Sequence, residues 1–144
     1  MIRHKPLRQR GKGTLSRLTH KLDRIFSEFI RRRDSDKDGN CRCCTCGVVR
    51  PWKEMHAGHY VGREARNTRW EEKNVHAQCP SCNTFHEGRK PEYTLFLQKK
   101  YGTEIVEQLV VAGKRPRHFK PIELEALILN YQSELKVLDQ GRIS

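Results

Sequence analysis

Two cysteine pairs of the form C-x-x-C constrain the fold of this chain more strongly than any other feature of its sequence. The first pair is Cys43 and Cys46, followed at once by Gly47, and the second is Cys79 and Cys82. Four thiolates match the ligand set of a tetrahedral Zn²⁺, and the two-residue gap lets both sulfurs of one turn face the same ion. The sequence therefore predicts a structural zinc site. Because four protein ligands leave no open position, this zinc would not be catalytic.

The six cysteines leave the first half of this ligand set open, because Cys41 and Cys44 form a second C-x-x-C in an overlapping frame. We favour Cys43 and Cys46 because the glycine that follows them suits a tight turn in which the backbone approaches the sulfur. Cys41 and Cys44 would then be spare thiols. Two disulfides are the alternative. We expect no secretion signal, however, and clustered cysteines without export are typical of metal ligands in a reducing compartment.

Basic charge is concentrated at one end of the chain. The formal net charge is +12, residues 1–33 hold eleven basic and two acidic side chains, and residues 119–144 hold three basic and four acidic ones. Such a balance favours a polyanionic partner, most simply nucleic acid. Contacts with phosphates would give affinity without sequence readout. A basic protein without such a partner is the alternative, but the uneven placement of the charge favours nucleic acid.

The basic end divides into two predicted parts. Residues 1–13 are expected to form a flexible arm, because proline and glycine interrupt any regular pattern. From Thr14 apolar residues recur at helical spacing, so residues 14–39 are predicted to be an amphipathic helix that ends near residue 33 in a turn. The polar face of this helix is either a DNA-binding surface or a solvated basic face. The DNA-binding candidates on it are Arg17, Lys21 and Arg24.

The turn after this helix resembles the opening of a calcium-binding loop, from Asp34 to Gly39. Calcium loops of this kind need a bidentate glutamate at the twelfth position, and Thr45 stands there. We therefore reject calcium at this position and interpret the segment as a turn that ends the helix.

Residues 40–90 contain every cysteine and four of the seven histidines, and we expect the chemical centre there. Short strands are predicted at 48–49 and 56–61, and a helix is predicted to begin near Pro80. The fold class is therefore α+β, with a small zinc-bound core flanked by helices. Residues 91–144 are expected to form C-terminal helices. Their predicted ranges are 91–101, 103–112 and about 121–139.

A motif lies between and after the cysteine pairs. His59 and Asn74 stand between them, and His86 follows the last cysteine by four residues. This order resembles the HNH nuclease family, in which zinc knuckles frame a ββα-metal core. More specifically, the chain is similar over about residues 20–102 to the NinG (Rap) recombination proteins of lambdoid phages. The segments that carry this resemblance are Lys21–Phe26, Trp52–Glu54, Gly58–Tyr60, Thr68–Trp70 and Asn74–Phe85.

The resemblance implies a role for each residue of the motif. His59 would be the general base that activates water, a task suited to an imidazole that is neutral near pH 7. Asn74 would tie down the loop that orients this histidine. His86 would bind the catalytic ion, Mg²⁺ or Mn²⁺, which stabilises charge on the scissile phosphate and the leaving oxygen.

The sequence departs from the HNH pattern just before the predicted base. Family members often carry an aspartate metal ligand there, and this chain has Gly58. Residues 56 and 58 share one face of a strand, so His56 is a candidate for the missing ligand, and Glu87 is another. A site rich in histidine would tolerate softer ions such as Mn²⁺ or Ni²⁺ better than an all-oxygen site would.

The remaining candidates have a functional and a structural interpretation. Arg63, Arg66 and Arg69 recur every third residue after the predicted base, where they would grip phosphates or line a solvated loop. Trp52 and Trp70 are interpreted as packing residues. Four histidines are interpreted as ordinary surface or structural groups, namely His4, His20, His76 and His118.

Together these features predict an endonuclease that hydrolyses phosphodiester bonds. The NinG resemblance implies branched recombination intermediates as substrates, such as Holliday junctions or D-loops, and paired cuts would suit a homodimer. The rivals are an HNH nickase or restriction-like enzyme acting on duplex DNA, and a non-catalytic zinc module that binds DNA. No apolar run approaches the roughly 20 residues of a membrane span. We expect a cytoplasmic protein without membrane contact, in the bacterial host cell if a phage encodes it.

Overall fold

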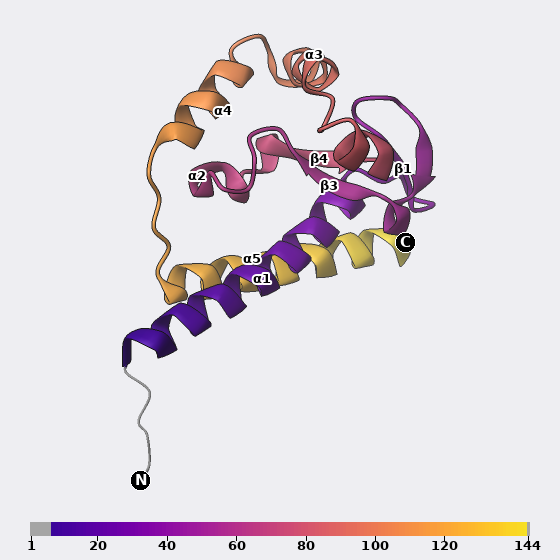
Figure 1. Cartoon of the computed structure of the whole chain (residues 1–144). Coiled ribbons are helices and arrows are strands. Elements are labelled where there is room, and N and C mark those ends of the chain that lie inside the picture. The colour runs from indigo at the N-terminus through magenta and orange to yellow at the C-terminus, as the bar shows by residue number, and fades with distance from the viewer. Residues whose placement is uncertain (1–6, 144) are drawn as a thin grey trace.

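The computed structural model describes the backbone of residues 7–143 and the side chains of residues 13–141. Within that part of the chain it contains five α-helices and two separate two-stranded antiparallel sheets (Figure 1). This mixture confirms the predicted α+β class. Among the described helices, none is both long enough and apolar enough to cross a membrane.

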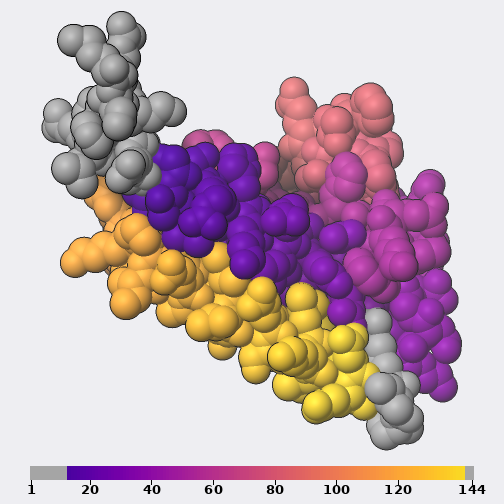
Figure 2. Space-filling model, turned by 90° about the horizontal axis from the view of Figure 1, so that it is seen from below, coloured from indigo at the N-terminus to yellow at the C-terminus, as the bar shows by residue number. Residues whose placement is uncertain are grey.

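The two longest helices, α1 (Leu7–Arg33) and α5 (Pro121–Ile143), lie side by side along one face of the molecule (Figure 2). Leu22, Phe26 and Ile30 of α1 are almost fully buried. The Phe26 ring meets Tyr131 of α5 edge-on, with 5.0 Å between ring centroids. Each such apolar side chain contributes about 1.5–3 kcal/mol on burial. This contact holds α1 between α5 and the second of the two sheets.

The first helix begins at Leu7, so the prediction of a flexible arm over residues 1–13 is wrong from that residue onward. Gly11 and Gly13 each cost the helix only about 0.5–1 kcal/mol relative to alanine. Arginine, lysine, glutamine and leucine around them favour helix, and each added residue adds a backbone hydrogen bond. Residues 1–6 lie outside the described part of the chain.

The turn after α1 has the structure expected of a turn and not of a calcium loop. The Asp36 carboxylate accepts hydrogen bonds from the backbone amides of Asp38 and Asn40, each at 2.9 Å. A side chain engaged in this way closes the turn locally. The chain then enters β1 (Asn40–Arg42), which pairs antiparallel with β2 (Val49–Pro51). This hairpin encloses the first cysteine pair.

The second sheet pairs β3 (His56–His59) with β4 (Val75–Gln78), so that Gly58 faces His76 and His59 faces Val75. We predicted the region of β2 and β3 but neither β1 nor β4. All four residues of β4 are buried, so its sequence lacks the alternation that marks a half-exposed strand. Between β3 and β4 lie the short α2 (Arg66–Arg69) and a 3-10 turn over Glu72–Asn74.

The helix expected from Pro80 is a single π-helical turn over Ser81–Phe85. It ends because Glu87, Gly88 and Arg89 adopt left-handed conformations, with φ of 52°, 82° and 46°. The chain then forms α3 (Lys90–Tyr101) and α4 (Ile105–Lys114), which agree closely with the predicted pair of helices. Their buried residues pack with Tyr60 in a separate small core.

Candidate metal centre and histidine cavity

The structure brings together the four cysteines that the sequence predicted as zinc ligands. The sulfur atoms of Cys43, Cys46, Cys79 and Cys82 all lie within 4.8 Å of one another. This spacing suits four thiolates around one tetrahedral ion. Cys41 is fully buried outside the cluster, where its sulfur lies 3.5 Å from the Asp34 carbonyl.

Local backbone geometry builds this cluster. Gly47 has φ of 80°, and its amide donates to the Cys43 carbonyl at 3.0 Å, which closes the first knuckle. The position therefore requires a residue that adopts the left-handed region without strain, as the sequence indicated. In the second knuckle the Cys82 amide points at the Cys79 sulfur at 3.5 Å, and Arg89 Nε donates to the Cys82 sulfur at 3.1 Å.

The surroundings of the cluster shift the pKa values of its thiols. Burial opposes ionisation of Cys43, but hydrogen bonds from Thr45 and from backbone amides outweigh it and lower the pKa of this thiol to about 6. Burial, and then the neighbouring thiols, raise the pKa of Cys46 to about 12. The pKa values of Cys43 and Cys46 are therefore shifted in opposite directions. A bound Zn²⁺ would deprotonate all four ligands.

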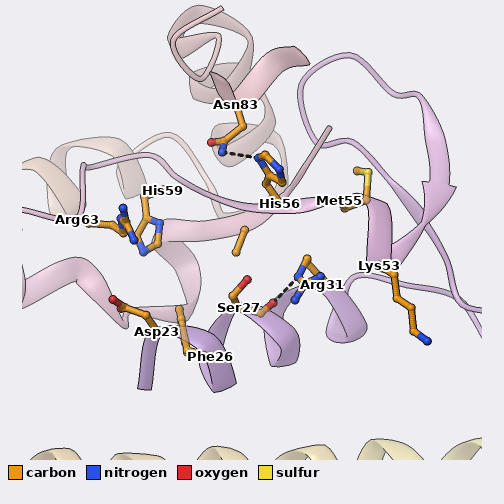
Figure 3. Close-up of a pocket in the computed structure, with 11 residues that line it drawn as sticks. Asp23, Phe26, Ser27, Arg31, Lys53, Met55, His56, His59, Arg63 and Asn83 are labelled. Carbon is orange, nitrogen blue, oxygen red and sulfur yellow. Dashed lines mark hydrogen bonds between the residues drawn. The ribbon is translucent and has the colours of Figure 1, made fainter. Parts of the chain in front are cut away.

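A cavity of about 630 Å³ lies between α1 and β3 (Figure 3). Three elements supply most of its polar walls, and Lys53 and Arg63 line it as well. The side chains from the three elements are Asp23, Ser27 and Arg31 of α1, His56 and His59 of β3, and Asn83 of the turn that contains Cys82.

His59 is held in a defined orientation in this cavity. Its Nε2 lies 2.8 Å from the backbone carbonyl of Arg69. A carbonyl only accepts hydrogen bonds, so Nε2 carries the ring proton and Nδ1 is left as an acceptor. Burial lowers the pKa of His59 below its ordinary value of 6.5, which keeps the imidazole neutral at pH 7.

Asn74 is fully buried and does not line the cavity. Its Oδ1 accepts from the Val61 amide at 2.8 Å, and its Nδ2 donates to the carbonyls of Val61 and Thr68 at 2.9 and 3.0 Å. All of its amide groups are thus used to close the loop between β3 and β4. This loop also carries the carbonyl that holds His59, so Asn74 is placed to orient the histidine indirectly.

His86 does not join His59. It is exposed and lies with Glu87 in a separate small cavity beside Phe85 and Arg89. The expectation that His86 and His59 share one site is therefore not met. The helical turn ends at Phe85, and His86 directly precedes the left-handed residues Glu87, Gly88 and Arg89.

Asn83 occupies the position that sequence reasoning gave to His86. Its Nδ2 lies 3.1 Å from Nδ1 of His56, and both residues line the cavity that contains His59. The sequence held one signal for it, since Asn83 directly follows the last cysteine of the cluster and must stay close to the metal knuckle.

Gly58 has no room for the aspartate that related motifs carry. A Cβ at this position would lie 2.7 Å from Cδ of Gln78, whose side chain is fully buried across the sheet. The departure from the HNH pattern is therefore fixed by packing. His56 is the side chain that β3 contributes toward Asn83.

The predicted arginines have three different placements. Arg63 lines the cavity, and Arg66 is exposed on α2 outside it. Arg69 is instead paired with Asp23, whose carboxylate it binds at 3.0 and 2.5 Å. The prediction that Arg69 grips phosphate therefore loses its support, because its guanidinium is engaged within the protein.

Two of the structural interpretations are confirmed. His76 is fully buried, with Nδ1 3.2 Å from the Tyr93 hydroxyl and Nε2 2.8 Å from the Tyr101 hydroxyl. Trp70 is buried and packs edge-on against Phe119. The helical candidates Arg17, Lys21 and Arg24 are exposed on α1.

Fold and site together define a small α+β protein with a four-cysteine cluster that could hold a metal ion, beside a histidine-lined cavity. Residues 3–141 match the family described as the Bacteriophage Lambda NinG protein. The chain belongs to the NinG family.

Individual relatives agree with this assignment. Protein ninG of Salmonella phage P22 is 33% identical over 115 residues, which cover 79% of this chain and 54% of that protein. Protein ninG of Escherichia phage lambda is 34% identical over 116 residues, which cover 79% of this chain and 53% of that protein. The chain thus spans about half the length of these relatives. No solved structure matches the chain.

Proposed function

We propose that this chain is a metal-dependent endonuclease that hydrolyses phosphodiester bonds in DNA. The observation that best supports the proposal is the hydrogen bonding, protonation and location of His59. Its neutral imidazole donates from Nε2 to the Arg69 carbonyl and keeps Nδ1 as an acceptor, in the cavity that also contains His56 and Asn83. Such an imidazole is suited to take a proton from an attacking water near pH 7.

His56 and Asn83 are the residues that would hold the catalytic ion. Their side chains are held together by the 3.1 Å contact between Asn83 Nδ2 and His56 Nδ1, and they offer an imidazole nitrogen and the amide oxygen of Asn83 as ligands. This pair fits Mn²⁺ or Mg²⁺ completed by water and phosphate oxygens. When bound, the ion would stabilise charge on the scissile phosphate and on the leaving oxygen. His59 would remove the proton from the water, and Asn74 would keep the loop around it in place.

The order of elements supports an HNH assignment. An antiparallel pair, β3 and β4, is followed by the short helical turn that contains Asn83. HNH nucleases, which the sequence resembles, have the same order of two strands and a helix around the ion. In this assignment Asn83 takes the place of the third motif residue.

The charges around the cavity fit a DNA strand. Arg31, Lys53 and Arg63 line it. Arg17 and Arg24 precede Arg31 by fourteen and seven residues, which is close to whole numbers of helical turns. These three cations therefore lie along one edge of α1 that leads to the cavity. Such a row would bind phosphates without reading bases.

By resemblance to the NinG proteins, the substrate would be branched DNA formed in recombination, in the cytoplasm of a bacterial host. Resolving a four-way junction needs two cuts, which a two-fold homodimer would provide. A nuclease for ordinary duplex would use the same residues. The non-catalytic alternative predicts DNA binding without cleavage.

A cleavage assay separates these possibilities. The protein is incubated with a four-way junction and with a linear duplex of the same sequence, with Mg²⁺, with Mn²⁺ and with EDTA. We expect metal-dependent cutting of the junction and little cutting of the duplex. Equal cutting of both substrates would favour a nuclease that acts on ordinary duplex DNA. Binding without cutting in either metal would contradict the enzymatic proposal.

A further inference from the structure

Asp23 of α1 lies outside the motif and is nevertheless connected to His59. Its carboxylate accepts hydrogen bonds from Arg69 Nε at 3.0 Å, from Arg69 Nη2 at 2.5 Å and from Trp70 Nε1 at 3.0 Å. The side chains of Asp23 and Arg69 are 17% and 16% exposed, so water screens this ion pair only weakly. Asp23 thus grips two consecutive residues of the loop between β3 and β4.

The first of those residues also supplies the partner of His59. The Arg69 carbonyl, which belongs to the peptide between Arg69 and Trp70, accepts the hydrogen bond from Nε2 of His59. Because Asp23 holds the side chains on both sides of this peptide, it limits rotation of the carbonyl. The carbonyl in turn fixes which ring nitrogen of His59 carries the proton.

We infer that Asp23 is a positioning residue for His59, acting through the Arg69–Trp70 peptide. This inference rests on the proposed nuclease function. It makes α1 a support of the active site as well as a surface for DNA. It also explains an acidic side chain in an otherwise basic cavity, since the Arg69 guanidinium neutralises the carboxylate that would repel a phosphate.

The test replaces Asp23 by asparagine, with Glu28→Gln as the matched control. Glu28 lies on the same helix and pairs with Arg32 at 3.3 Å, but it does not line the cavity. Two quantities are measured in each variant. They are kcat and KM for Mn²⁺-dependent junction cleavage, and the tautomer of His59 from the ¹⁵N spectrum of its ring.

For Asp23→Asn we expect kcat to fall about ten- to a hundredfold, as small displacements of a catalytic group do, with KM changed by less than about twofold. The His59 ring should change from a single tautomer, protonated at Nε2, to a mixture. Glu28→Gln should match the wild type in both measurements. Unchanged kcat and tautomer in Asp23→Asn would overturn the inference, and so would a loss of kcat with an unchanged tautomer.

A second variant keeps the inference testable if Asp23→Asn does not fold. Arg69→Gln removes the cation but keeps the backbone carbonyl, and it should reproduce both effects. The double variant should lose no more kcat than either single variant, because both act through one peptide. Additive losses would contradict the inference. If the wild type cuts no DNA with any metal, the proposed function fails, whereas the tautomer measurement still decides the role of Asp23.

Discussion

The side-chain amide of Asn83 lies 3.1 Å from Nδ1 of His56, which links the second metal knuckle directly to the strand that carries His59. The four-cysteine cluster and the cavity are thus neighbouring parts of one structure. A bound zinc would fix Cys82, and the residue directly after it would then be fixed opposite β3. In the proposed nuclease, an ion without an open coordination position would in this way support the residues of the cavity.

Replacing Asn83 by alanine should weaken binding of the catalytic ion. One of the two proposed protein ligands would be lost, so the Mn²⁺ concentration for half-maximal cleavage should rise about tenfold or more. His86→Ala should leave it near the wild-type value, because His86 is exposed in a different cavity. A Mn²⁺ titration of junction cleavage checks this. The opposite ranking of the two variants would restore His86 to the site.

Loss of the structural zinc should unfold the core of the protein. Zinc binding stabilises small domains by many kcal/mol, so a strong chelator should abolish cooperative thermal unfolding followed by circular dichroism. Cys82→Ser should lower both the zinc content and the melting temperature. Cys44→Ala, outside the cluster, should retain one zinc per chain. Normal zinc content in Cys82→Ser would show that the ligand set is different.

Alanine at Gly58 should destabilise the protein by about 1–3 kcal/mol, as overpacking of a core does. The new Cβ would meet the buried Gln78 side chain. Gly13→Ala is a control that should change the free energy of unfolding in the opposite direction. This glycine lies within α1 with open space around it, so alanine should stabilise by about 0.5–1 kcal/mol. Urea unfolding measures both changes, and a neutral Gly58→Ala would contradict the packing at this position.

The stability of the folded protein should decrease as the pH is lowered, because of His76. Burial lowers the pKa of this histidine from 6.5 to about 3. Between these values the unfolded chain binds a proton that the folded protein excludes, so unfolding becomes easier as the pH falls from 6.5 towards 3. His76→Gln does not titrate and should show a weaker dependence. Urea unfolding at pH 7 and pH 5 provides the comparison, and equal pH dependence of the two proteins would argue against a neutral buried His76.

Cleavage should retain an active base below pH 6.5. Burial lowers the pKa of His59, and the positive charge of Arg63 acts in the same direction. His59 stops acting as a base only when it is protonated. The apparent pKa on the acidic side of the kcat–pH profile should therefore be lower than 6.5. An apparent pKa above 6.5 on the acidic side of the profile would indicate that another residue is the base.

Some of this site could be predicted from the sequence because the signals were local. Gly47 identified the correct cysteine frame, since a left-handed residue is required directly after the pair. The helices at Lys90–Tyr101 and Ile105–Lys114 were predictable because Gly102 divides them.

Other features depended on contacts between distant residues. The partner of Arg69 is Asp23, which no spacing pattern connects to it. His86 lies in a different cavity, next to left-handed residues of which two, Glu87 and Arg89, are not glycine, so no residue pattern marked this change of direction. The strand Val75–Gln78 is buried on both faces and therefore shows no alternation.

The central claim is that His59 is the base of a DNA-cleaving site. Single-turnover cleavage of a four-way junction with Mn²⁺ tests it most directly, with wild type, His59→Ala and the exposed-histidine control His118→Ala. We predict that His59→Ala lowers the rate by at least about a hundredfold while binding the junction as tightly as wild type, and that His118→Ala cuts normally. Equal cleavage rates for His59→Ala and wild type would contradict the account.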